Sequence, residues 1–382
     1  MVDRGLLLYH PAGNNNVRRP ATYTSFRIDN FRCFPKLALT DLERVNLIAG
    51  VNNVGKTAFL EALFLHCGAY NPRLTLNLNA FRGIGGMTVD LRPSAATPWD
   101  SLFARFNTSN PVELLGQDEQ TGKRLLRLTV VTDPHELAQI AHPPQEDTSR
   151  PSQPTLASSE VTQVLKLYYK HRETTATYYL ILNPAGIATT PVAPPPPFPT
   201  YILPARMSIP AREEAELFGR IDIEGRQDVL LRVLQLLEPR LTRLSMVTAG
   251  GEPRLHGDIG VGRLVPLPLM GDGMVRLATL VLRIMNAPNG VVLVDEAENG
   301  LHHSIILKVW AAIATVARQF NTQVFATTHS LECIKAAHTA FAQSDKYDFR
   351  LHRLERSNET IRAVTYDRDT LTAAIEERFE VR

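Results

Sequence analysis

Cysteine and tryptophan are scarce in this chain, which has three cysteines and two tryptophans among 382 residues. Cys33, Cys67 and Cys333 stand alone, and their spacing indicates neither a disulfide framework nor a metal site built from cysteines. We therefore expect each of them to be a small buried hydrophobe.

Long hydrophobic runs are also missing, because no apolar stretch approaches the length that spans a membrane and the N-terminus lacks the apolar core of a signal peptide. The net charge is only +2, so no overall positive field indicates nucleic acid. A chain of this length can bury more than one core. We expect a cytoplasmic protein of two lobes without a membrane partner.

A phosphate-binding loop is the strongest feature that the sequence does contain. Residues 50–57 read GVNNVGKT, between an apolar run at 45–48 and the helical pattern AFLEALFL. Gly50 and Gly55 allow backbone torsions that a Cβ would forbid, so the loop amides can turn inward around a phosphate. Lys56 would reach the β- and γ-phosphates, and the Thr57 hydroxyl would ligate Mg²⁺. The residues expected to contact the nucleotide are Gly50, Asn52, Asn53, Val54, Gly55, Lys56, Thr57 and Ala58.

Two adjacent carboxylates follow a second apolar run. Residues 291–303 read VVLVDEAENGLHH, typical of a buried parallel strand that ends in Asp295 and Glu296. We expect Asp295 to support Mg²⁺ and Glu296 to polarise the attacking water, because phosphoryl transfer depends on positioning and charge neutralisation. A solvated acidic turn after a strand is the alternative interpretation.

A third apolar run, at residues 322–330, ends in Thr328, His329 and Ser330. A histidine at the edge of the same sheet can reach the γ-phosphate and report its presence. Taken alone, His329 could also be an ordinary polar residue at a strand end, but its place after the loop and the acidic pair favours the sensor.

A second glycine-rich turn precedes a helix within residues 264–284, where Gly271 and Gly273 flank Asp272. The N-terminus of a helix is an anion site. One chain would then have two phosphate-facing helix ends for one triphosphate. A head-to-tail pair, in which this turn completes the other subunit's site, resolves the mismatch.

The rest of the chain predicts an α/β protein with few special features. We expect a strand at 24–34, a second strand that leads into the loop, and a helix at 56–66 that packs one face on the core. Further strands are expected at 125–131, 164–170 and 176–182, loops at 142–154 and 192–199, and helices at 212–218 and 226–237. No heptad pattern or internal repeat is present.

The order of these motifs resembles the ABC-type ATPase head of RecF, SMC-like repair proteins and OLD (overcoming lysogenization defect) nucleases. FRIDNFRCF, VNLIAGVNNVGKTAFLEALFL, LMGDGMVRL, VDEAENGLHH and FATTHS are most similar to AAA-type ATP-binding proteins grouped with the OLD family. The resemblance implies a P-loop NTPase fold with a mostly parallel core sheet, an antiparallel β-subdomain and a helical lobe. It also implies ATP and Mg²⁺ as cofactors and a homodimer that forms when ATP binds.

The resemblance also divides the chain. It implies an N-terminal ATPase part with the β-subdomain at 23–205, a helical lobe with the signature turn at 206–286, and a C-terminal core part at 287–382. The turn formers and missing periodicity before it predict a flexible tail at 1–22.

The same resemblance assigns roles to individual residues. Lys56 and Thr57 take phosphate and Mg²⁺, Asp295 supports Mg²⁺, Glu296 is the catalytic base and His329 is the γ-phosphate switch. The turn Gly271, Asp272 and Gly273 is the signature that acts in trans, and Arg32 corresponds to a position near the nucleotide.

Some positions depart from the ABC pattern. Gly271 stands where transporter heads have a serine, and His302 stands where many heads have an aspartate. No glutamine fits a Q-loop. Only residues 330–382 follow His329, too few for the Toprim nuclease domain of OLD proteins. Asp367 and Asp369 resemble part of a Toprim motif, but we expect a solvated turn.

The leading hypothesis is an ATP-gated dimeric switch in anti-phage defence or DNA maintenance, working with a separate nuclease or toxin effector. The alternative is an ATP-dependent nucleic-acid clamp in DNA repair or recombination, with DNA near a basic and aromatic cluster. A strand with alternating exposed side chains explains the same cluster. Its members are Lys166, Tyr168, Tyr169, Lys170 and Arg172. A transporter motor would need a membrane partner and a coupling surface that the sequence does not indicate.

The motifs predict that binding and hydrolysis can be separated by substitution. Lys56→Ala should abolish nucleotide binding, because it removes the charge that meets the phosphates. Glu296→Gln should keep binding and lose hydrolysis by roughly 100-fold or more, as expected when a water-orienting base is lost. Equilibrium binding of a fluorescent ATP analogue and phosphate release measure the two effects. Native turnover by Glu296→Gln would make Glu296 a structural acid.

Overall fold

The structure is a computed structural model that describes residues 23–82, 97–119, 121–141, 163–183, 186–205, 210–358 and 360–382. The tail expected at 1–22 and the loop expected at 142–154 lie outside the described residues. The expected domain boundaries stay predictions.

A six-stranded sheet forms the core, in the order β16-β15-β3-β14-β13-β9. Five strands run parallel and β16 is antiparallel to β15. Their bounds are β3 Val45–Ala49, β9 Thr200–Leu203, β13 Val291–Val294, β14 Gln323–Thr327, β15 Phe349–Ser357 and β16 Thr360–Tyr366. Strands β3, β13 and β14 are buried on both faces, which explains their continuous apolar runs. Their carboxyl ends meet at one edge, and that edge positions the site.

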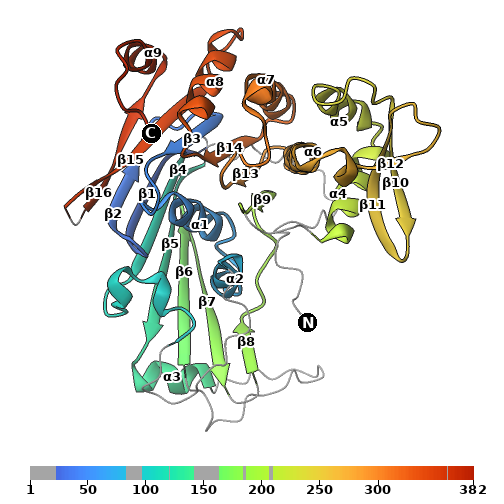
Figure 1. Cartoon of the computed structure of the whole chain (residues 1–382). Coiled ribbons are helices and arrows are strands. Elements are labelled where there is room, and N and C mark those ends of the chain that lie inside the picture. Colours follow the sequence, from blue (N-terminus) through green and yellow to red (C-terminus); the bar gives the residue numbers. More distant parts are fainter. Residues whose placement is uncertain are drawn as a thin grey trace.

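A seven-stranded antiparallel sheet lies beside the core, in the order β2-β1-β4-β5-β6-β7-β8 (Figure 1). The three strands expected between residues 125 and 182 are confirmed as β5, β6 and β7. The bounds are β1 Tyr23–Phe31, β2 Phe34–Leu39, β4 Val112–Asp118, β5 Gly122–Val131, β6 Gln163–His171, β7 Thr174–Asn183 and β8 Gly186–Thr190. The prediction of one strand leading into the loop is wrong in part. Residues 40–44 separate β2, in the antiparallel sheet, from β3, in the core.

Helix α1 (Lys56–Cys67) lies between the two sheets and contacts β1 and β4 on one side and β9, β13 and β14 on the other. Every residue of the helix except Thr57 is buried, including Glu61 and His66. The prediction that one face packs on the core is therefore confirmed, and the opposite face of the helix is buried as well. The second sheet covers the face that a helix on a single sheet would expose to solvent.

A buried histidine joins α1 to the antiparallel sheet. His66 Nδ1 lies 2.8 Å from Tyr23 Oη, and its Nε2 lies 2.9 Å from the Arg124 carbonyl oxygen. Burial, with a smaller effect of the Arg124 charge, lowers the pKa of His66 to about 3. The ring is therefore neutral at physiological pH and acts as a fixed hydrogen-bonding bridge.

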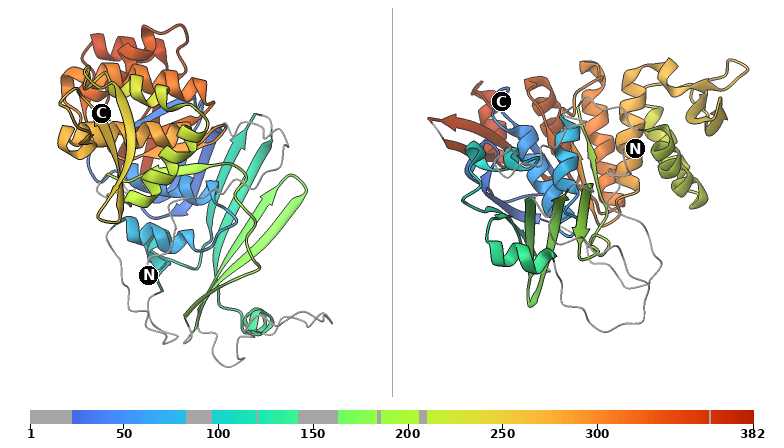
Figure 2. Two further views of the ribbon diagram at one scale, coloured as in Figure 1. Left: turned by 90° about the vertical axis from the view of Figure 1, so that its right-hand side faces the viewer. Right: turned by 90° about the horizontal axis from the view of Figure 1, so that it is seen from below.

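Other helices cover the second face of the core sheet or lie beside the antiparallel sheet (Figures 1 and 2). Their bounds are α2 Leu74–Phe81, α3 Pro134–Ala141, α6 Asp272–Met285, α7 His303–Gln319, α8 Leu331–Ala342 and α9 Arg368–Glu376. The helix α2 and the short turns η1 (Asp100–Leu102) and η2 (Ala104–Phe106) lie between α1 and β4 in the chain.

A lobe beside the core contains α4 (Ala211–Ile223) and α5 (Gln227–Leu234), which confirms the two helices expected there. The lobe is not only helical. It also contains a three-stranded sheet of β10 (Arg243–Ala249), β11 (Glu252–Asp258) and β12 (Val265–Pro266), next to the turn η3 (Leu267–Met270).

Candidate nucleotide-binding site

The loop between β3 and α1 has the shape of a phosphate cradle, and its two glycines are required by its geometry. Gly50 has φ 145° and Gly55 has φ 105°, in the region that favours glycine. A Cβ on Gly55 would lie 2.6 Å from Phe34 Cζ, and one on Gly50 would lie 2.8 Å from the Leu354 carbonyl oxygen. Val54 and Ala58 are buried beneath the loop, whereas Asn52, Asn53 and Thr57 are exposed. A side chain at either glycine would therefore displace the packing that shapes the loop.

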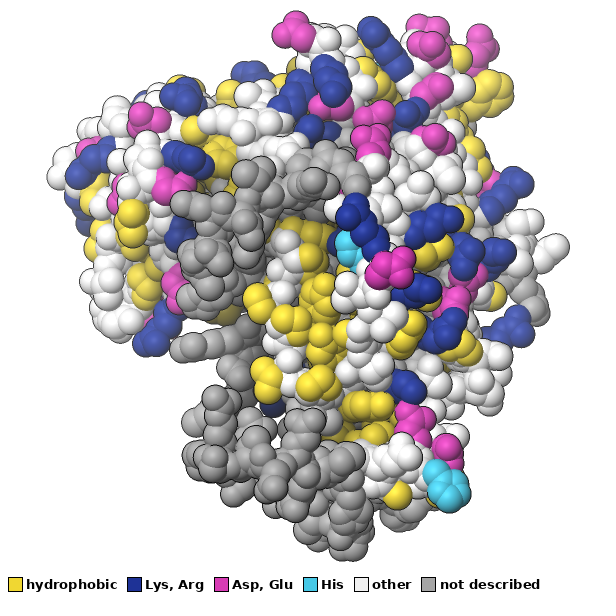
Figure 3. Space-filling view, turned by 180° about the vertical axis from the view of Figure 1, so that it is seen from behind, with side chains coloured by type: hydrophobic (Ala, Val, Ile, Leu, Met, Phe, Trp, Pro, Cys, Tyr) yellow, Lys and Arg dark blue, Asp and Glu magenta, His cyan; other side chains and the backbone are white. Residues whose placement is uncertain are grey.

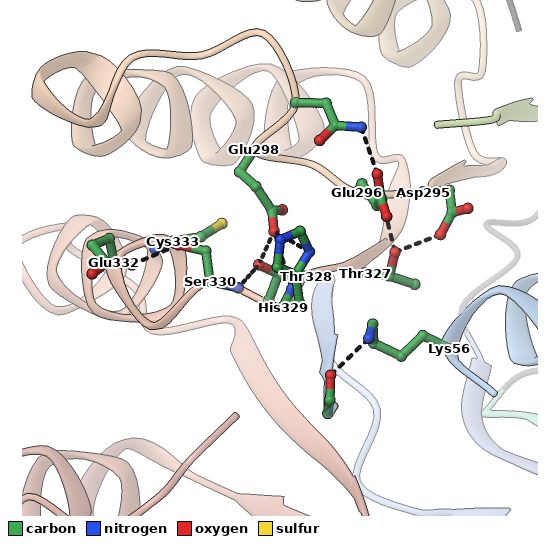
Figure 4. Close-up of polar contacts among 12 residues, drawn as sticks. Lys56, Asp295, Glu296, Glu298, Thr327, Thr328, His329, Ser330, Glu332 and Cys333 are labelled. Atoms are coloured by element: carbon green, nitrogen blue, oxygen red, sulfur yellow. Dashed lines mark hydrogen bonds and ion pairs between the residues drawn. The ribbon is translucent and has the colours of Figure 1, made fainter. Parts of the chain in front are cut away.

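Lys56 folds back across this loop. Its Nζ donates to the carbonyl oxygens of Gly50 at 2.7 Å and Val51 at 3.1 Å (Figure 4). Burial lowers the pKa of Lys56, and the nearby carboxylates of Asp295, Glu296 and Glu298 oppose this shift. The acceptors that the ammonium contacts are thus neutral carbonyl oxygens, and phosphate oxygens would be better partners for it. The loop fits a triphosphate.

Asp295 brings three elements of the core together. Its carboxylate accepts hydrogen bonds from Thr57 Oγ1 at 3.1 and 3.2 Å and from Thr327 Oγ1 at 2.6 Å. Asp295 is 9% exposed. Among the described residues, no group of three or more His, Cys, Asp or Glu side chains could hold a metal ion. The hydroxyl of Thr57 and the carboxylate of Asp295 are oxygen donors that lie together, and they suit Mg²⁺, which commonly combines one or two protein ligands with phosphate oxygens and water.

Glu296 lies in a constrained turn directly after Asp295. Its φ is 50°, and its amide donates to Thr327 Oγ1 at 2.8 Å. Asn299 Nδ2 donates to Glu296 Oε2 at 2.7 Å. The carboxylate expected to act as the base is therefore held in one orientation by the turn and by an amide.

Arg276 of α6 binds the same turn from the other side. Its guanidinium donates to the carbonyl oxygens of Asp295 at 2.6 Å, Glu296 at 3.2 Å and Pro204 at 3.1 Å. Burial lowers the pKa of Arg276, although the charges of Asp295, Glu296 and Glu298 work against this. The helix that begins at the signature turn is thereby connected to the Asp295–Glu296 turn of its own chain.

Sequence reasoning missed Thr327, Asn299 and Arg276. Thr327 stands directly before the Thr328–His329 pair, and Asn299 lies three residues after Glu296, so their positions were the only available signals. Arg276 carried no signal, because one arginine on an amphipathic helix is usually a surface residue.

His329 contacts Glu298 in this structure. Its Nδ1 lies 3.2 Å from Glu298 Oε1, and its side chain is 47% exposed. His329 follows β14, which lies between the strands of the loop and the acidic pair. The topology thus brings His329 to the expected edge of the sheet, next to a carboxylate that was not expected to take part.

The signature turn is open to solvent at two of its three residues. Gly271 has φ 111°, and a Cβ there would meet nothing within 4 Å, while Asp272 is exposed. Gly273 differs, because a Cβ there would lie 2.6 Å from the Gly300 carbonyl oxygen of the same chain. The glycine at 273 is therefore required for packing within the chain, whatever a second subunit does.

Arg32 is held by α1. Its Nε lies 2.6 Å from Glu61 Oε2, and the two side chains are 9% and 1% exposed. Arg82 also pairs with Glu61, at 2.7 Å. Burial lowers the pKa of Arg32, and Glu61 opposes the shift. Contact between Arg32 and a nucleotide stays a prediction.

Several polar residues that the comparison with ABC and Toprim motifs raises form local hydrogen bonds. His302 is the N-cap of α7 and accepts from the Ser304 amide. Gln235 follows α5 and donates to the Leu241 carbonyl oxygen at 2.7 Å. Asp367 caps α9 through a reciprocal bond with Thr370, so the Asp367–Asp369 pair marks a helix start.

The basic and aromatic cluster on β6 divides between two faces. Lys166, Tyr168 and Lys170 line hollows on the outer face of the antiparallel sheet. Tyr169 points the other way, is 2% exposed, and packs against Tyr70 at a ring-centroid distance of 4.7 Å. Arg172 lies in the β6–β7 turn and donates to the Thr121 carbonyl oxygen. The alternation expected of a strand is confirmed, and Tyr169 cannot stack on a base.

Comparison with known proteins gives one family, described as "AAA domain, putative AbiEii toxin, Type IV TA system", which matches residues 45–334. A relative from Helicobacter pylori (strain ATCC 700392 / 26695), named "ATP/GTP phosphatase", is 23% identical over 371 residues, covering 90% of this chain and 95% of the relative.

Similar solved structures include an SMC head bound to the C-terminal winged-helix domain of ScpA, at 12% identity and TM-score 0.47, covering 93% of this chain and 99% of that chain. The SMC head domain from Thermotoga maritima has 12% identity and TM-score 0.40, covering 90% and 99%. In the part of the chain that the structure describes, no helix combines the length and apolar character needed to cross a membrane.

The hydroxyl of Thr327 offers a test of how Asp295 and Glu296 are positioned. Thr327→Val keeps the side-chain shape but removes the donor to Asp295 and the acceptor for the Glu296 amide. We expect nucleotide binding to survive and hydrolysis to fall by roughly 10- to 100-fold, as for other groups that orient metal ligands. Thr315→Val is the control, because the Thr315 hydroxyl donates to the Ala311 carbonyl oxygen within α7. Equal hydrolysis by both variants would contradict the assignment.

Proposed function

We propose that this chain, which belongs to the AAA domain family described above and is an ATPase, works as an ATP-gated dimeric switch. ATP and Mg²⁺ would bind at the loop between β3 and α1. The observation that carries the proposal is the group of Lys56, Thr57, Asp295 and Glu296 at one edge of the core sheet.

In this proposal each residue has a separate task. The loop amides and Lys56 hold the β- and γ-phosphates, and Thr57 and Asp295 hold the metal ion, which would neutralise phosphate charge when bound. Glu296 orients the attacking water, and the bond from Asn299 limits its freedom. The name of the Helicobacter pylori relative includes GTP as well as ATP, so turnover of both nucleotides should be measured.

The dimer follows from the second helix end. Gly271 and Asp272 lie at the exposed N-terminus of α6, where the helix dipole favours an anion. A second copy that presented this end to the γ-phosphate would complete the site in a two-fold arrangement. Within each chain, the hydrogen bonds of Arg276 connect the signature helix to the carbonyl oxygens of the Asp295–Glu296 turn. Dimerisation and hydrolysis would therefore be coupled.

His329 would distinguish ATP from ADP. It follows β14 at the edge of the sheet where Asp295 and Lys56 also lie, and its ring is partly exposed. A donor on this ring could meet the γ-phosphate, which ADP lacks. The switch would thus respond to the triphosphate.

The cellular role we propose is anti-phage defence or DNA maintenance, with a separate nuclease or toxin effector. The family description refers to a type IV toxin–antitoxin system, and the motifs resemble the OLD group. ATP binding and hydrolysis by this chain would control when the effector is active, and the effector would carry out the nuclease or toxin reaction. Coexpression with neighbouring genes and phage challenge would test this role.

A mixed dimer tests the shared site. Lys56→Ala removes phosphate binding in cis, and Asp272→Trp should block the approach of the signature turn in trans. Asp272 is the better position for the bulky residue, because any side chain at Gly273 would disturb its own chain. If sites act independently and subunits exchange freely, an equal mixture should regain roughly a quarter of native ATPase activity, since half the dimers have one intact site.

Asp369→Trp is the matched control for this experiment, because Asp369 is also an exposed acid in the first turn of a helix. It should leave ATPase activity unchanged. Light scattering with ATP should detect the mixed dimers. Native activity of Asp272→Trp alone would exclude the signature turn from the chemistry.

A nucleic-acid clamp is the second candidate function, and the outer face of the antiparallel sheet favours it. Two hollows of about 550 and 670 Å³ share Leu125 and Lys170 as lining residues. Seen from behind, the face combines hydrophobic side chains with neighbouring Lys and Arg (Figure 3). Tyr168 could stack on a base there. The positive charge is reduced, however, because Lys166 pairs with Glu136 and Arg127 with Glu113.

The salt dependence of DNA binding separates the two functions. A clamp should bind single- or double-stranded DNA and lose affinity steeply as salt rises, because bound counterions are released. Lys170→Ala should then reduce the slope of log affinity against log salt by about one unit. Lys308→Ala, on α7 away from this face, is the control. If the protein bound no DNA at low salt, the clamp would be excluded and the ATP-gated dimeric switch would remain.

A further inference from the structure

Glu298, a third acidic residue of the 291–303 segment, contacts Thr328 and His329, which directly follow β14. Its Oε1 accepts hydrogen bonds from Thr328 Oγ1 at 2.8 Å and from the His329 amide at 3.0 Å (Figure 4). The same oxygen lies 3.2 Å from His329 Nδ1. Both the backbone and the ring of His329 are therefore positioned by one carboxylate.

The burial of Glu298 makes this contact significant. Its side chain is only 11% exposed, and its Oε2 is buried without a hydrogen bond among the described residues. A carboxylate in such a place is costly unless a positive group or several donors stabilise it. In the described part of the chain, His329 is the one ionisable group paired with it. The charge of Glu298 also acts to raise the pKa of Lys56 and of Arg276, but neither residue forms an ion pair with it.

The contact decides what the ring of His329 can do. A carboxylate at Nδ1 fixes the orientation of an imidazole and keeps a proton on that nitrogen. Nε2 is then the atom left to meet a ligand, and in the described residues it makes no hydrogen bond. To donate to a phosphate, Nε2 must also carry a proton. A ring with the Glu298 carboxylate at Nδ1 and a phosphate at Nε2 would donate to an anion on each side, and both bonds would be charge-assisted.

We infer that Glu298 is the positioning residue of the sensor: it orients His329 and supplies the charge that lets the ring donate to the γ-phosphate. The inference rests on the proposed sensor role of His329. Glu298 does not contact phosphate in this arrangement. It acts through the histidine, as the carboxylate of a carboxylate–histidine–ligand relay does.

Glu298→Gln tests the inference, because the amide keeps the shape and an acceptor but loses the charge. Affinities for ADP and for a non-hydrolysable ATP analogue are measured for the full chain. We expect the ADP affinity to stay unchanged and the preference for the ATP analogue over ADP to fall by about tenfold or more. His329→Ala should cause the same loss, and the double variant should add nothing further, because the two residues act as a unit.

Glu332→Gln is the matched control. Glu332 lies in the first turn of α8, three residues after His329, and accepts from Ser330 Oγ at 2.9 Å, but it is exposed and forms no ion pair with His329. It should keep the native preference. In ¹⁵N spectra with the ATP analogue bound, the His329 ring should carry two protons in the native protein and one in Glu298→Gln.

The outcomes separate this inference from the proposed function. A native preference in His329→Ala would overturn the sensor itself. A loss in His329→Ala with a native preference in Glu298→Gln would overturn only the role of Glu298. Equal weakening of ADP and analogue binding by Glu298→Gln would also overturn it, since the residue would then support the fold and not the sensor. Additive losses in the double variant would show that the two residues act separately.

Discussion

The buried carboxylate of Asp295 is the constraint on which the site depends. A carboxylate at this depth must be satisfied, and the groups that satisfy it come from different elements: Thr57 from the start of α1, and Thr327 from the end of β14. Arg276 adds a bond to the backbone of the same residue. Each of these groups is thereby fixed relative to the other two. A metal ion bound between Thr57 and Asp295 would meet a geometry that already exists, so little reorganisation would be needed.

The position of α1 explains why this geometry is rigid. The helix begins at the phosphate cradle and is buried between two sheets, and His66 ties its far end to the antiparallel sheet. Movement of the cradle would require movement of a helix that is packed on all sides. Protein interiors of this kind respond as units because they are close-packed. Conformational change on nucleotide binding is therefore more readily placed in the lobe of α4, α5 and β10 to β12, and in the exposed signature turn at the start of α6.

Helix α6 is connected to the segment from Asp295 to Gly300 by two contacts. Gly273 approaches the Gly300 carbonyl oxygen too closely for any side chain, and Arg276 holds the carbonyl oxygens of Asp295 and Glu296. Glu298, between these positions, holds His329. The short segment from Asp295 to Gly300 thus contacts Thr57, the signature helix and His329. In the proposed switch it is the segment through which a second subunit and the γ-phosphate would affect one another.

The sequence by itself determined the motifs and most of the elements that carry them. The cradle at residues 50–57, the acidic strand end at 295–296 and the histidine at 329 are local patterns, since each depends on residues that are neighbours in the chain. The strands β5, β6 and β7 were also predictable, because a strand pattern depends on residues that are neighbours in the chain. The all-round burial of α1 was not, because it depends on a second sheet whose place beside the helix has no local signature. Thr57 and Asp295 are 238 residues apart, and Thr327 and Asp295 are 32 apart. Only the tertiary structure decided that Thr57 and Thr327 satisfy the buried Asp295, and that Glu298 holds His329. The reason is that the order of the parallel strands brings together chain segments whose spacing in the sequence is unrelated.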